Sequence, residues 1–561
     1  MSDSYNTTAQ MIWLVSAGLI VTGLLNFTES GEVGIRRFPT WTSGAVLVAA
    51  GVILLLWRGA TLPALALAAS IALAIGGLLQ FGEVLTGHHK PIFRGILTAL
   101  TGIFGAVLTI FWPKLSLWVL GIAFGAWLVI RGARYLLTAL SNGNFSAPRW
   151  LRKTVSLGMA TLAIIGLVAV LGLGAVTAWL HSTGQNTVND AFYLAPANVP
   201  EAPGQLIRAE PLSKGMLPET NAWRMLYTTT NSDGGPAVAS GILTLPKNAM
   251  GELPVISWAN GTKGVAARCG LSQSATPFDD GPASARADML AHGWAVVATD
   301  YVGLGTTGPH PYLVPEAEAH AVLDATRAAR QLSPTVSKGT TLSNQTVIWG
   351  HSQGGHAALA SAQAAPEYAP EFEVLGVAAM APASDLKQLA VSVADSTAGK
   401  VISSYMATSW DELYPELGIR ENLPHSIRKA VDRISKNCFY GTEVLTSLAQ
   451  SSQLFEPVFT AAEMTGELGA RLEDNSAPYP ADVPVFIAQG AADVLVLPQM
   501  QQGFFANLCA ANSNAAYKEY EGLDHMPLVG ADSALNADLV AFSNSVFGGT
   551  AQFPSNGERC S

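Results

Sequence analysis

The pattern of hydrophobic and polar positions divides the chain into two parts. Up to about residue 182, long apolar runs with hardly any charge follow one another, whereas from about residue 206 short β-rich runs alternate with Ala-rich helical stretches. Six of the apolar runs approach or exceed the roughly 20 residues that a helix needs to cross a bilayer. We therefore predict an α-helical six-span transmembrane domain over residues 1–182, with the spans Ala9–Phe27, Trp41–Trp57, Leu62–Phe81, Phe93–Trp112, Leu117–Leu137 and Val155–Leu180.

Two other interpretations of these runs have less support. A cleaved signal peptide would explain only the first run, which no basic segment precedes and which five more runs follow. A buried helical core would not explain six successive runs that carry almost no charge.

The distribution of Lys and Arg predicts the orientation of the spans. The loops after the first, third and fifth spans carry nine Lys and Arg residues, whereas the loops after the second and fourth carry Arg58 and Lys114. Basic loops stay on the cytoplasmic side, so we expect both ends of the chain outside. The sequence therefore predicts a multi-pass protein of the plasma membrane whose C-terminal domain lies on the extracytoplasmic side.

The N-terminal part also repeats itself. Residues 23–29 read GLLNFTE and residues 77–83 read GLLQFGE, 54 positions later. Repeated hairpins of this kind indicate duplication. In layout, residues 10–180 resemble the HdeD-like family of six-span membrane proteins, a resemblance that implies no particular chemistry.

The alternation after residue 206 predicts a mostly parallel sheet covered by helices. Residues 183–205 are polar and rich in Pro and Ala, which is typical of a linker. Between about residues 385 and 479 the strand pattern stops and the composition favours helices, as expected for a cap over an active site. The predicted strands are Pro254–Ala259, Trp294–Thr299, Thr346–Trp349, Val374–Met380, Val485–Gln489 and Ala516–Tyr520, and the predicted helices outside the cap are Glu316–Gln331, Gly354–Ala364, Pro498–Ala510 and Ser533–Val546.

One motif in this part points to nucleophilic catalysis. Residues 350–354 read GHSQG and match G-x-S-x-G, with a β-rich run before them and a small-residue helix after them. A sharp strand-to-helix turn holds the serine at a strained backbone position, clear of the sheet and above the positive end of the helix dipole. This context predicts an α/β-hydrolase domain over residues 206–561, with Ser352 as its nucleophile.

A serine hydroxyl needs a base within hydrogen-bond reach. In this fold the base follows the nucleophile and the acid along the chain. Downstream of Ser352 the candidates are His356, His425 and His525. We expect His356 to point away from the serine, and His425 falls in the predicted cap. His525, in a loop between the last predicted strand and the final helix, is therefore the predicted base.

The base in turn needs an acid that orients it. Asp493 follows the predicted strand Val485–Gln489 and precedes an apolar run, which suits a buried carboxylate. Asp385, after the preceding strand, is the rival candidate. Asp524 is too close to His525 in sequence to orient its ring. We predict Asp493 as the third member of the triad.

The oxyanion of the tetrahedral intermediate needs fixed donors, commonly the N–H after the nucleophile and one more. Here the first donor is Gln353. Two segments are candidates for the second, the loop at residues 260–262 after one strand and Asp300-Tyr301 after the next. General features of the fold favour the first of these segments.

Charge and cysteine content restrict the picture further. The chain is 49% hydrophobic and 13% charged with a net charge of −10, and we found no basic patch that would predict nucleic-acid binding. The four cysteines all fall in the C-terminal part. An even count outside the cytoplasm predicts two disulfides. Three pairings are possible, and we favour Cys509–Cys560 together with Cys269–Cys438, the latter tying cap to core. No spacing resembles a metal site, and we expect no cofactor.

From about Gln205 onward the chain resembles the secretory lipase family, the lipase A type of yeasts and actinobacteria. The resemblance implies an acyl-ester hydrolase whose cap acts as lid, and it assigns Asp300, together with Gln353, to the oxyanion hole. Asn260 departs from the His that many relatives carry, which puts a role for its side chain in doubt. The segments that carry the resemblance are 260–264 (NGTKG), 300–303 (DYVG), 350–354 (GHSQG), 489–493 (QGAAD) and 522–525 (GLDH).

These observations together predict a membrane-anchored, extracytoplasmic serine lipase or esterase that hydrolyses lipids or other acyl esters. An acyltransferase that uses the same triad is one alternative. A membrane stress or interaction protein with a catalytically inert hydrolase domain is another.

Overall fold

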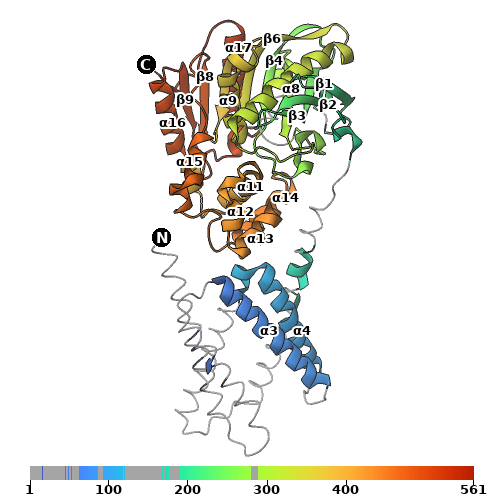
Figure 1. The fold of residues 1–561 in the computed structure, drawn as a ribbon, viewed down its shortest axis with the longest axis vertical. Helices are drawn as coiled ribbons and strands as arrows, with labels where there is room; N and C mark the ends of the chain where they lie inside the picture. The colour runs from blue at the N-terminus through green and yellow to red at the C-terminus, as the bar shows by residue number, and fades with distance from the viewer. Residues whose placement is uncertain are drawn as a thin grey trace, which may run out of the picture. The chain divides into compact units, whose positions relative to one another are not determined.

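The computed structural model describes residues 62–85, 92–117, 190–215, 217–278 and 288–560, together with short helical pieces elsewhere in the first 180 residues. The chain divides into two compact units, Met1–Ser182 and Thr183–Ser561. Figure 1 shows a pair of helices in the first unit and a helix-covered sheet in the second.

In the N-terminal unit, α3 (Leu62–Leu85) and α4 (Ile92–Phe111) coincide with the third and fourth predicted spans. Within the described residues, one helix segment, Leu65–Gly82, is long and apolar enough to cross a membrane, and the apolar segment Gly95–Phe111 is shorter. The other four predicted spans lie almost entirely outside the described residues. The structure therefore supports one candidate span and does not by itself support six.

Small residues bring α3 and α4 close together. A Cβ atom added to Gly77 would lie 2.8 Å from Ala99 O, and one added to Gly102 would lie 3.1 Å from Gly77 Cα. Seven residues before Gly77 in α3, Ser70 Oγ donates a hydrogen bond of 2.8 Å to Ala106 O. Close backbone approach at small residues is the way helices associate in membranes.

Among the described residues of the second unit, ten strands form one mixed sheet in the order β1-β2-β3-β5-β4-β6-β7-β8-β9-β10. Neighbours from β5 to β9 are parallel, whereas β1, β2, β3 and β10 pair antiparallel. The strands are β1 (Leu206–Pro211), β2 (Thr220–Thr230), β3 (Pro236–Pro246), β4 (Gly251–Ala259), β5 (Ala295–Val302), β6 (Thr340–His351), β7 (Glu373–Met380), β8 (Val485–Gly490), β9 (Ala515–Tyr520) and β10 (Glu558–Arg559). The mostly parallel sheet of an α/β-hydrolase-like fold is thus present.

Helices cover both faces of this sheet (Figure 1). Alternate residues of a strand point to opposite faces. Accordingly Ile348 packs in one buried cluster with residues of α9 (Gln353–Tyr368), while the next residue, Trp349, packs in another with residues of α17 (Leu535–Phe547). Helices α8 (Pro315–Val336) and α16 (Pro498–Ala510) contribute to the same cluster as α9.

The segment between β7 and β8, where we predict the cap, holds six α-helices, and its described residues contain no strand. The central cap helix α11 is buried along most of its length, with Tyr405 and Trp410 fully enclosed. The cap helices are α10 (Leu386–Ser392), α11 (Thr397–Leu413), α12 (Ile419–Asn422), α13 (His425–Ile434), α14 (Thr442–Ser452) and α15 (Glu467–Asp474).

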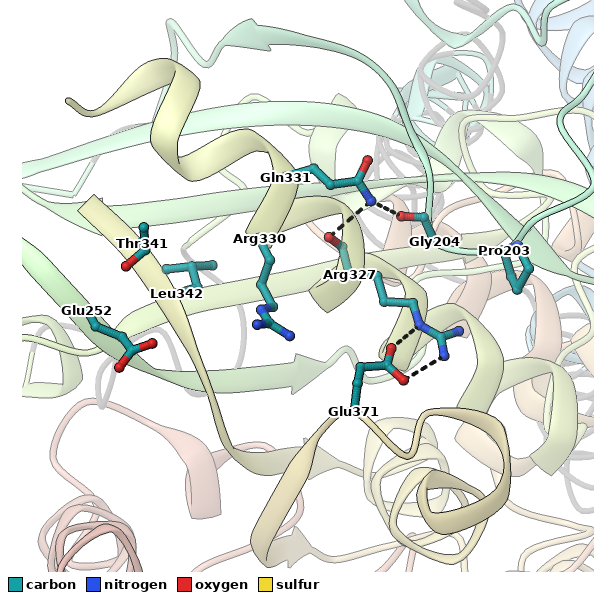
Figure 2. Close-up of a pocket in the computed structure, with 9 residues that line it drawn as sticks. All are labelled: Pro203, Gly204, Glu252, Arg327, Arg330, Gln331, Thr341, Leu342 and Glu371. Atoms are coloured by element: carbon teal, nitrogen blue, oxygen red, sulfur yellow. Dashed lines mark hydrogen bonds and ion pairs between the residues drawn. The ribbon is translucent and has the colours of Figure 1, made fainter. Parts of the chain in front are cut away.

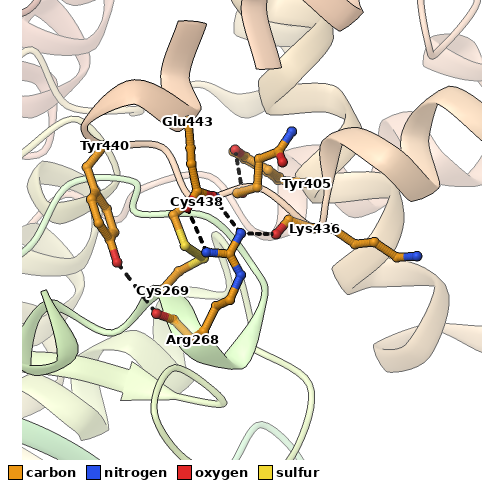
Figure 3. Close-up of a disulfide and its surroundings, with 8 residues drawn as sticks. Arg268, Cys269, Tyr405, Lys436, Cys438, Tyr440 and Glu443 are labelled. Atoms are coloured by element: carbon orange, nitrogen blue, oxygen red, sulfur yellow. Dashed lines mark hydrogen bonds and ion pairs between the residues drawn. A yellow bond between two sulfur atoms is a disulfide. The ribbon is translucent and has the colours of Figure 1, made fainter. Parts of the chain in front are cut away.

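Both favoured cysteine pairings are present. Cys269–Cys438 joins the core to the cap across 169 positions, and Cys509–Cys560 joins α16 to the C-terminal segment. Beside the first disulfide, the Arg268 guanidinium donates two hydrogen bonds to the Glu443 carboxylate, one of them 2.8 Å long (Figure 3). This junction holds the cap against the core between α13 and α14.

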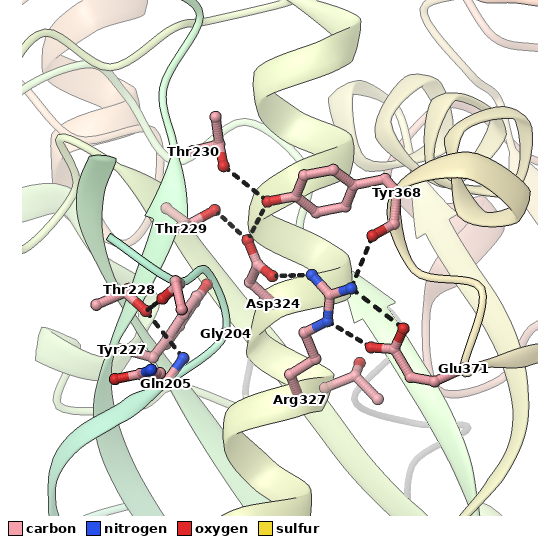
Figure 4. A network of polar contacts seen from close by, with 12 residues as sticks. Gly204, Gln205, Tyr227, Thr228, Thr229, Thr230, Asp324, Arg327, Tyr368 and Glu371 are labelled. Atoms are coloured by element: carbon pink, nitrogen blue, oxygen red, sulfur yellow. Dashed lines mark hydrogen bonds and ion pairs between the residues drawn. The ribbon is translucent and has the colours of Figure 1, made fainter. Parts of the chain in front are cut away.

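A second polar network ties β2 to two helices (Figure 4). The fully buried carboxylate of Asp324, on α8, accepts hydrogen bonds from Thr229 Oγ1, Tyr368 OH and Arg327 Nη1 at 2.7, 2.7 and 2.8 Å. Burial raises the pKa of Asp324. Since a buried charge must be hydrogen-bonded to be tolerated, this network fixes α8 against the sheet.

Candidate active site

Ser352 lies at the turn between β6 and α9, in a strained backbone conformation with φ of 57° and ψ of −119°. A Cβ atom on Gly350 would collide with Gly354 O, and one on Gly354 would collide with Ala259 O, so this turn requires glycine at both positions. The Ser352 N–H donates to Met380 O at 2.9 Å. The G-x-S-x-G motif therefore forms the strand–turn–helix arrangement of a nucleophile elbow.

His525 and Asp493 form a buried pair. His525 Nδ1 lies 2.7 Å from Asp493 Oδ2, and the two residues are 7% and 3% exposed. The other carboxylate oxygen, Oδ1, accepts the main-chain N–H groups of Leu495 and Val496, both at 2.8 Å. The carboxylate is thus fixed by its own loop and holds the proton of the imidazole on Nδ1, which leaves Nε2 as a proton acceptor.

His351 brings the serine turn and the His525 loop together. His351 Nε2 lies 3.1 Å from His525 O, and the centroids of the two imidazole rings are 4.5 Å apart. Burial, and then the neighbouring His525, hold the pKa of His351 well below its usual range. A neutral His351 donates from Nε2 to the His525 carbonyl and adds no positive charge beside the base.

The hydroxyl of Ser352 makes no hydrogen bond to any described residue. Contacts between a nucleophile and its base are often long without substrate and shorten in the reacting complex. The structure therefore joins the nucleophile turn and the His525 loop through His351.

Gln353, the first residue of α9, has a main-chain N–H with no partner inside the helix. Its side chain is buried and donates from Nε2 to Glu318 Oε1 at 2.7 Å. This side chain is therefore held by α8, while the N–H stays at the positive end of the α9 dipole.

The family resemblance assigns Asp300 to the oxyanion hole, and the structure shows what the carboxylate of this residue contacts. It accepts Ser240 Oγ at 2.6 Å and Ser272 N at 2.9 Å, together with the Ser272 hydroxyl. Burial raises the pKa of Asp300. A carboxylate held in this way stabilises the loop between β4 and β5, so only the main-chain N–H of Asp300 is a candidate oxyanion donor.

The rival oxyanion segment also lies beside the nucleophile turn. A Cβ atom on Gly261 would be 3.1 Å from His351 O. The side chain of Asn260 is occupied, since its Oδ1 accepts Trp258 Nε1 at 2.6 Å and its Nδ2 donates to Thr299 O at 2.5 Å. Here too a main-chain N–H is the available group, and both segments remain candidates.

The other titratable candidates have structural partners. Asp385 Oδ1 caps α10 by accepting Gln388 N at 2.8 Å. Asp524 Oδ1 accepts both His525 N at 2.7 Å and Val494 N at 3.2 Å, and so joins the two loops that carry the acid and the base. This contribution of Asp524, and that of His351, had no signal in the sequence because each depends on residues brought together by folding.

A separate open hollow of about 600 Å³ lies where α8 meets the first residues of β4 and β6, and it contains no triad residue (Figure 2). Its cations include Arg327, which is paired with Glu371. Among the residues that the structure describes, no cluster of three or more His, Cys, Asp or Glu side chains is arranged to hold a metal ion.

Comparisons with known proteins bear on the second unit. A sequence model of the secretory lipase family matches residues 284–538. A probable inactive lipase of Mycobacterium tuberculosis (strain CDC 1551 / Oshkosh) is 26% identical over 368 residues, which cover 61% of this chain and 78% of that protein. Lipase A of Moesziomyces aphidis is 22% identical over 364 residues, which cover 61% of this chain and 76% of that protein.

Solved structures share the fold. Lipase A of Candida antarctica in its closed state superposes with a TM-score of 0.54 at 19% identity, over 65% of this chain and 87% of that one. A putative hydrolase of Legionella pneumophila gives a TM-score of 0.52 at 16% identity, over 62% of this chain and all of the other. The C-terminal part of this chain is thus similar in sequence to secretory lipases and shares the fold of lipase A.

Proposed function

We propose that the C-terminal domain hydrolyses carboxylic esters through an acyl-enzyme on Ser352. The observation that carries the proposal is a serine at φ 57° on a strand–turn–helix, beside a loop whose imidazole is 2.7 Å from a buried carboxylate. A strained nucleophile position of this kind persists only where the surrounding structure fixes it.

In the first half of the reaction, Ser352 Oγ attacks the ester carbonyl carbon and His525 Nε2 takes the hydroxyl proton. Asp493 stabilises the imidazolium that results, because its Oδ2 already faces the protonated Nδ1. His525 then gives its proton to the leaving alcohol. In the second half, water attacks the acyl-enzyme with His525 again as base, and the carboxylic acid is released.

The negative oxygen of each tetrahedral intermediate lies against main-chain donors. The N–H of Gln353 is the first. The second is the N–H of Asp300 or one from the segment at residues 260–262, which lies against the nucleophile turn. Fixed donors of this kind each contribute about 10²–10³ in kcat.

We place the enzyme on the membrane, with acyl lipids as its substrate class. The apolar helix α3, the further apolar runs before residue 182 and the excess of basic residues in alternate loops support a multi-pass anchor with the hydrolase outside the cytoplasm. A phosphatase reporter is active only outside the cytoplasm, so a fusion after residue 205 should be active and one at residue 88, between the third and fourth predicted spans, should be inactive. An inactive fusion after residue 205, with an active one at residue 88, would reverse the orientation.

Hydrolysis of a series of p-nitrophenyl esters from acetate to palmitate tests the activity. We expect turnover by the wild type, none by Ser352→Ala, and unchanged turnover by the control Ser361→Ala, whose hydroxyl bonds only within α9. A preference for longer chains supports lipid substrates, whereas a strict preference for acetate contradicts them. Retained activity in Ser352→Ala would overturn the proposed mechanism.

A second candidate function is that of an inert membrane interaction protein. The relative from Mycobacterium tuberculosis, described as a probable inactive lipase, favours it. This alternative predicts that the wild type hydrolyses none of the esters and that Ser352→Ala changes nothing.

A further inference from the structure

A second group of titratable side chains lies behind the nucleophile turn, and the reaction described above does not use it. Glu318 from α8, His356 and Gln353 from α9, and His310 from the loop before α8 are each no more than 1% exposed. A buried carboxylate is costly unless it is paired and fully hydrogen-bonded.

Both oxygens of Glu318 are occupied. Oε1 accepts Gln353 Nε2 at 2.7 Å and the main-chain N–H of Leu313 at 3.0 Å. Oε2 lies 2.7 Å from His356 Nδ1. The second hydrogen of Gln353 Nε2 points to His310 Nε2 at 3.1 Å. Both hydrogens of Gln353 Nε2 are therefore donated in hydrogen bonds, which hold the side chain in one position.

The hydrogen-bond partners of His310 and His356 fix where the protons of this cluster lie. His310 Nδ1 lies 3.0 Å from Val302 O, so Nδ1 carries the proton and Nε2 accepts from Gln353. His356 Nε2 lies 2.8 Å from Asn475 O and must also carry a proton. The Glu318–His356 pair then holds one proton between Oε2 and Nδ1 and has no net charge. Such a neutral pair does not repel a negative oxygen that forms nearby.

The same cluster joins the cap to the nucleophile turn. Asn475, whose carbonyl accepts from His356, follows the last cap helix, α15. On the other side, Ser409 of cap helix α11 donates to His310 O at 2.6 Å and accepts from Tyr312 N at 3.1 Å. Two parts of the cap, α11 and the segment after α15, are thus connected through Glu318 and its partners to the residue that follows Ser352.

We propose that Glu318 is the positioning residue of the oxyanion hole: by holding the Gln353 side chain and the Leu313 loop, it fixes the main-chain N–H of Gln353 and couples that N–H to the cap. The inference rests on the proposed hydrolase function. Glu318 touches neither Ser352 nor the reacting atoms, so its effect is on geometry and not on proton transfer.

The test compares two substitutions in the full-length protein. In Glu318→Gln the amide oxygen still accepts from Gln353 and Leu313, and the amide nitrogen donates to a neutral His356, so all the hydrogen bonds are kept. Glu318→Leu leaves those three partners unsatisfied. Turnover of p-nitrophenyl butyrate is normalised to the number of sites labelled to completion by a fluorophosphonate.

We expect Glu318→Leu to lower kcat per labelled site about 10- to 100-fold with KM within about threefold, a smaller loss than that of an entire oxyanion donor. Glu318→Gln should recover kcat to within about threefold of the wild type. As a matched control, Asp324→Leu removes an equally buried carboxylate of α8 that has no contact with the nucleophile turn. It should lower the melting temperature and leave kcat per labelled site unchanged.

Wild-type kcat per labelled site in Glu318→Leu would overturn the inference, and so would a loss in Glu318→Gln as large as that in Glu318→Leu. If Glu318→Leu does not fold, Gln353→Met tests the same link, with the same fall in kcat expected and an unchanged kcat contradicting it. A wild type that neither hydrolyses esters nor reacts with the fluorophosphonate refutes the proposed function itself, and the inference falls with it.

Discussion

The carboxylate of Asp493 shows how far a single side chain is constrained by its neighbours. The carboxylate accepts hydrogen bonds from His525 Nδ1, from two main-chain N–H groups and, at 3.3 Å, from Gln489 Nε2. An acceptor surrounded only by donors cannot be replaced by a group that also donates. Because all its partners are donors, replacing the Asp493 carboxylate by an amide is a sensitive test of the proposed triad.

In Asp493→Asn, we expect kcat/KM for an ester substrate to fall about 10⁴-fold, because an amide NH₂ facing Nδ1 stabilises the wrong imidazole tautomer. The circular dichroism spectrum should not change. Asp524→Asn is the control, since its amide oxygen can still accept from His525 N and Val494 N. A loss of less than tenfold in Asp493→Asn would mean that this carboxylate is not the orienting acid.

The buried ring of His310 makes stability depend on pH. Burial lowers its pKa to about 4, whereas an unfolded chain has the ordinary value of about 6.5. Between these values the unfolded state binds the extra proton, so the His310 contribution is complete above pH 6.5 and is lost as the pH falls. At pH 5 the loss is about 2 kcal/mol.

We therefore expect the free energy of unfolding to drop less between pH 7 and pH 5 in His310→Gln than in the wild type, by about 2 kcal/mol. Urea denaturation at the two pH values measures the difference, in which contributions from other groups cancel. Equal drops in the two proteins would show that His310 is not held neutral.

The turn from β6 to α9 gives the clearest relation between sequence pattern and local structure. Glycine is needed at positions 350 and 354 because main-chain atoms already occupy the space that a side chain would fill. A rigid carbonyl cannot move aside as a flexible side chain can. We expect Gly354→Ala to lower the free energy of unfolding by about 3 kcal/mol and to abolish labelling of Ser352 by a fluorophosphonate.

Gly503→Ala is the matched control, because Gly503 lies in α16 and an added Cβ atom would meet nothing within 4 Å. There the substitution should stabilise the protein by about 0.4–1 kcal/mol. Chemical denaturation of both variants decides the question, and equal stabilities would contradict the steric account of the turn.

Strands β4 to β9 and helices α8, α9, α16 and α17 could be predicted from the sequence, because buried parallel strands read as short apolar runs between helical stretches. Strands β1, β2 and β3 were missed. β2 reads TNAWRMLYTTT, in which Arg and several Thr interrupt the apolar pattern. β10 has two residues and exists only by pairing with β9.

The candidate site was predictable to the extent that it follows a motif or a strand end. Ser352, Asp493 and His525 each come just after a strand, whereas Glu318 is separated from Gln353 by 35 positions and has no local pattern. The use of the Asp300 carboxylate by Ser240 and Ser272 was hidden for the same reason. Side chains that act by holding other side chains become visible only in the folded protein.

The molecule as a whole relies on covalent links between segments that are distant in sequence. The sulfur atoms of Cys269 and Cys438 belong to fully buried residues and join the core to the cap. A cross-link of this kind restricts the unfolded chain and also keeps the cap near the triad. The link at Cys509–Cys560 closes a shorter loop of 51 positions away from the cap.

Replacing Cys269 and Cys438 together by Ala should cost about 2–5 kcal/mol and should expose the cap, residues 385–479, to limited proteolysis. Replacing Cys509 and Cys560 should lower the melting temperature while the cap stays resistant. If the cap is equally resistant in both double variants, the core–cap disulfide does not anchor it.

The most direct test of the proposed chemistry is to locate a covalent adduct in the full-length protein. After reaction with a fluorophosphonate, proteolysis and mass spectrometry should find one modified residue, Ser352, and His525→Gln should slow its modification at least about 100-fold. An unmodified protein, an adduct on another residue, or an unchanged rate in His525→Gln would contradict the account.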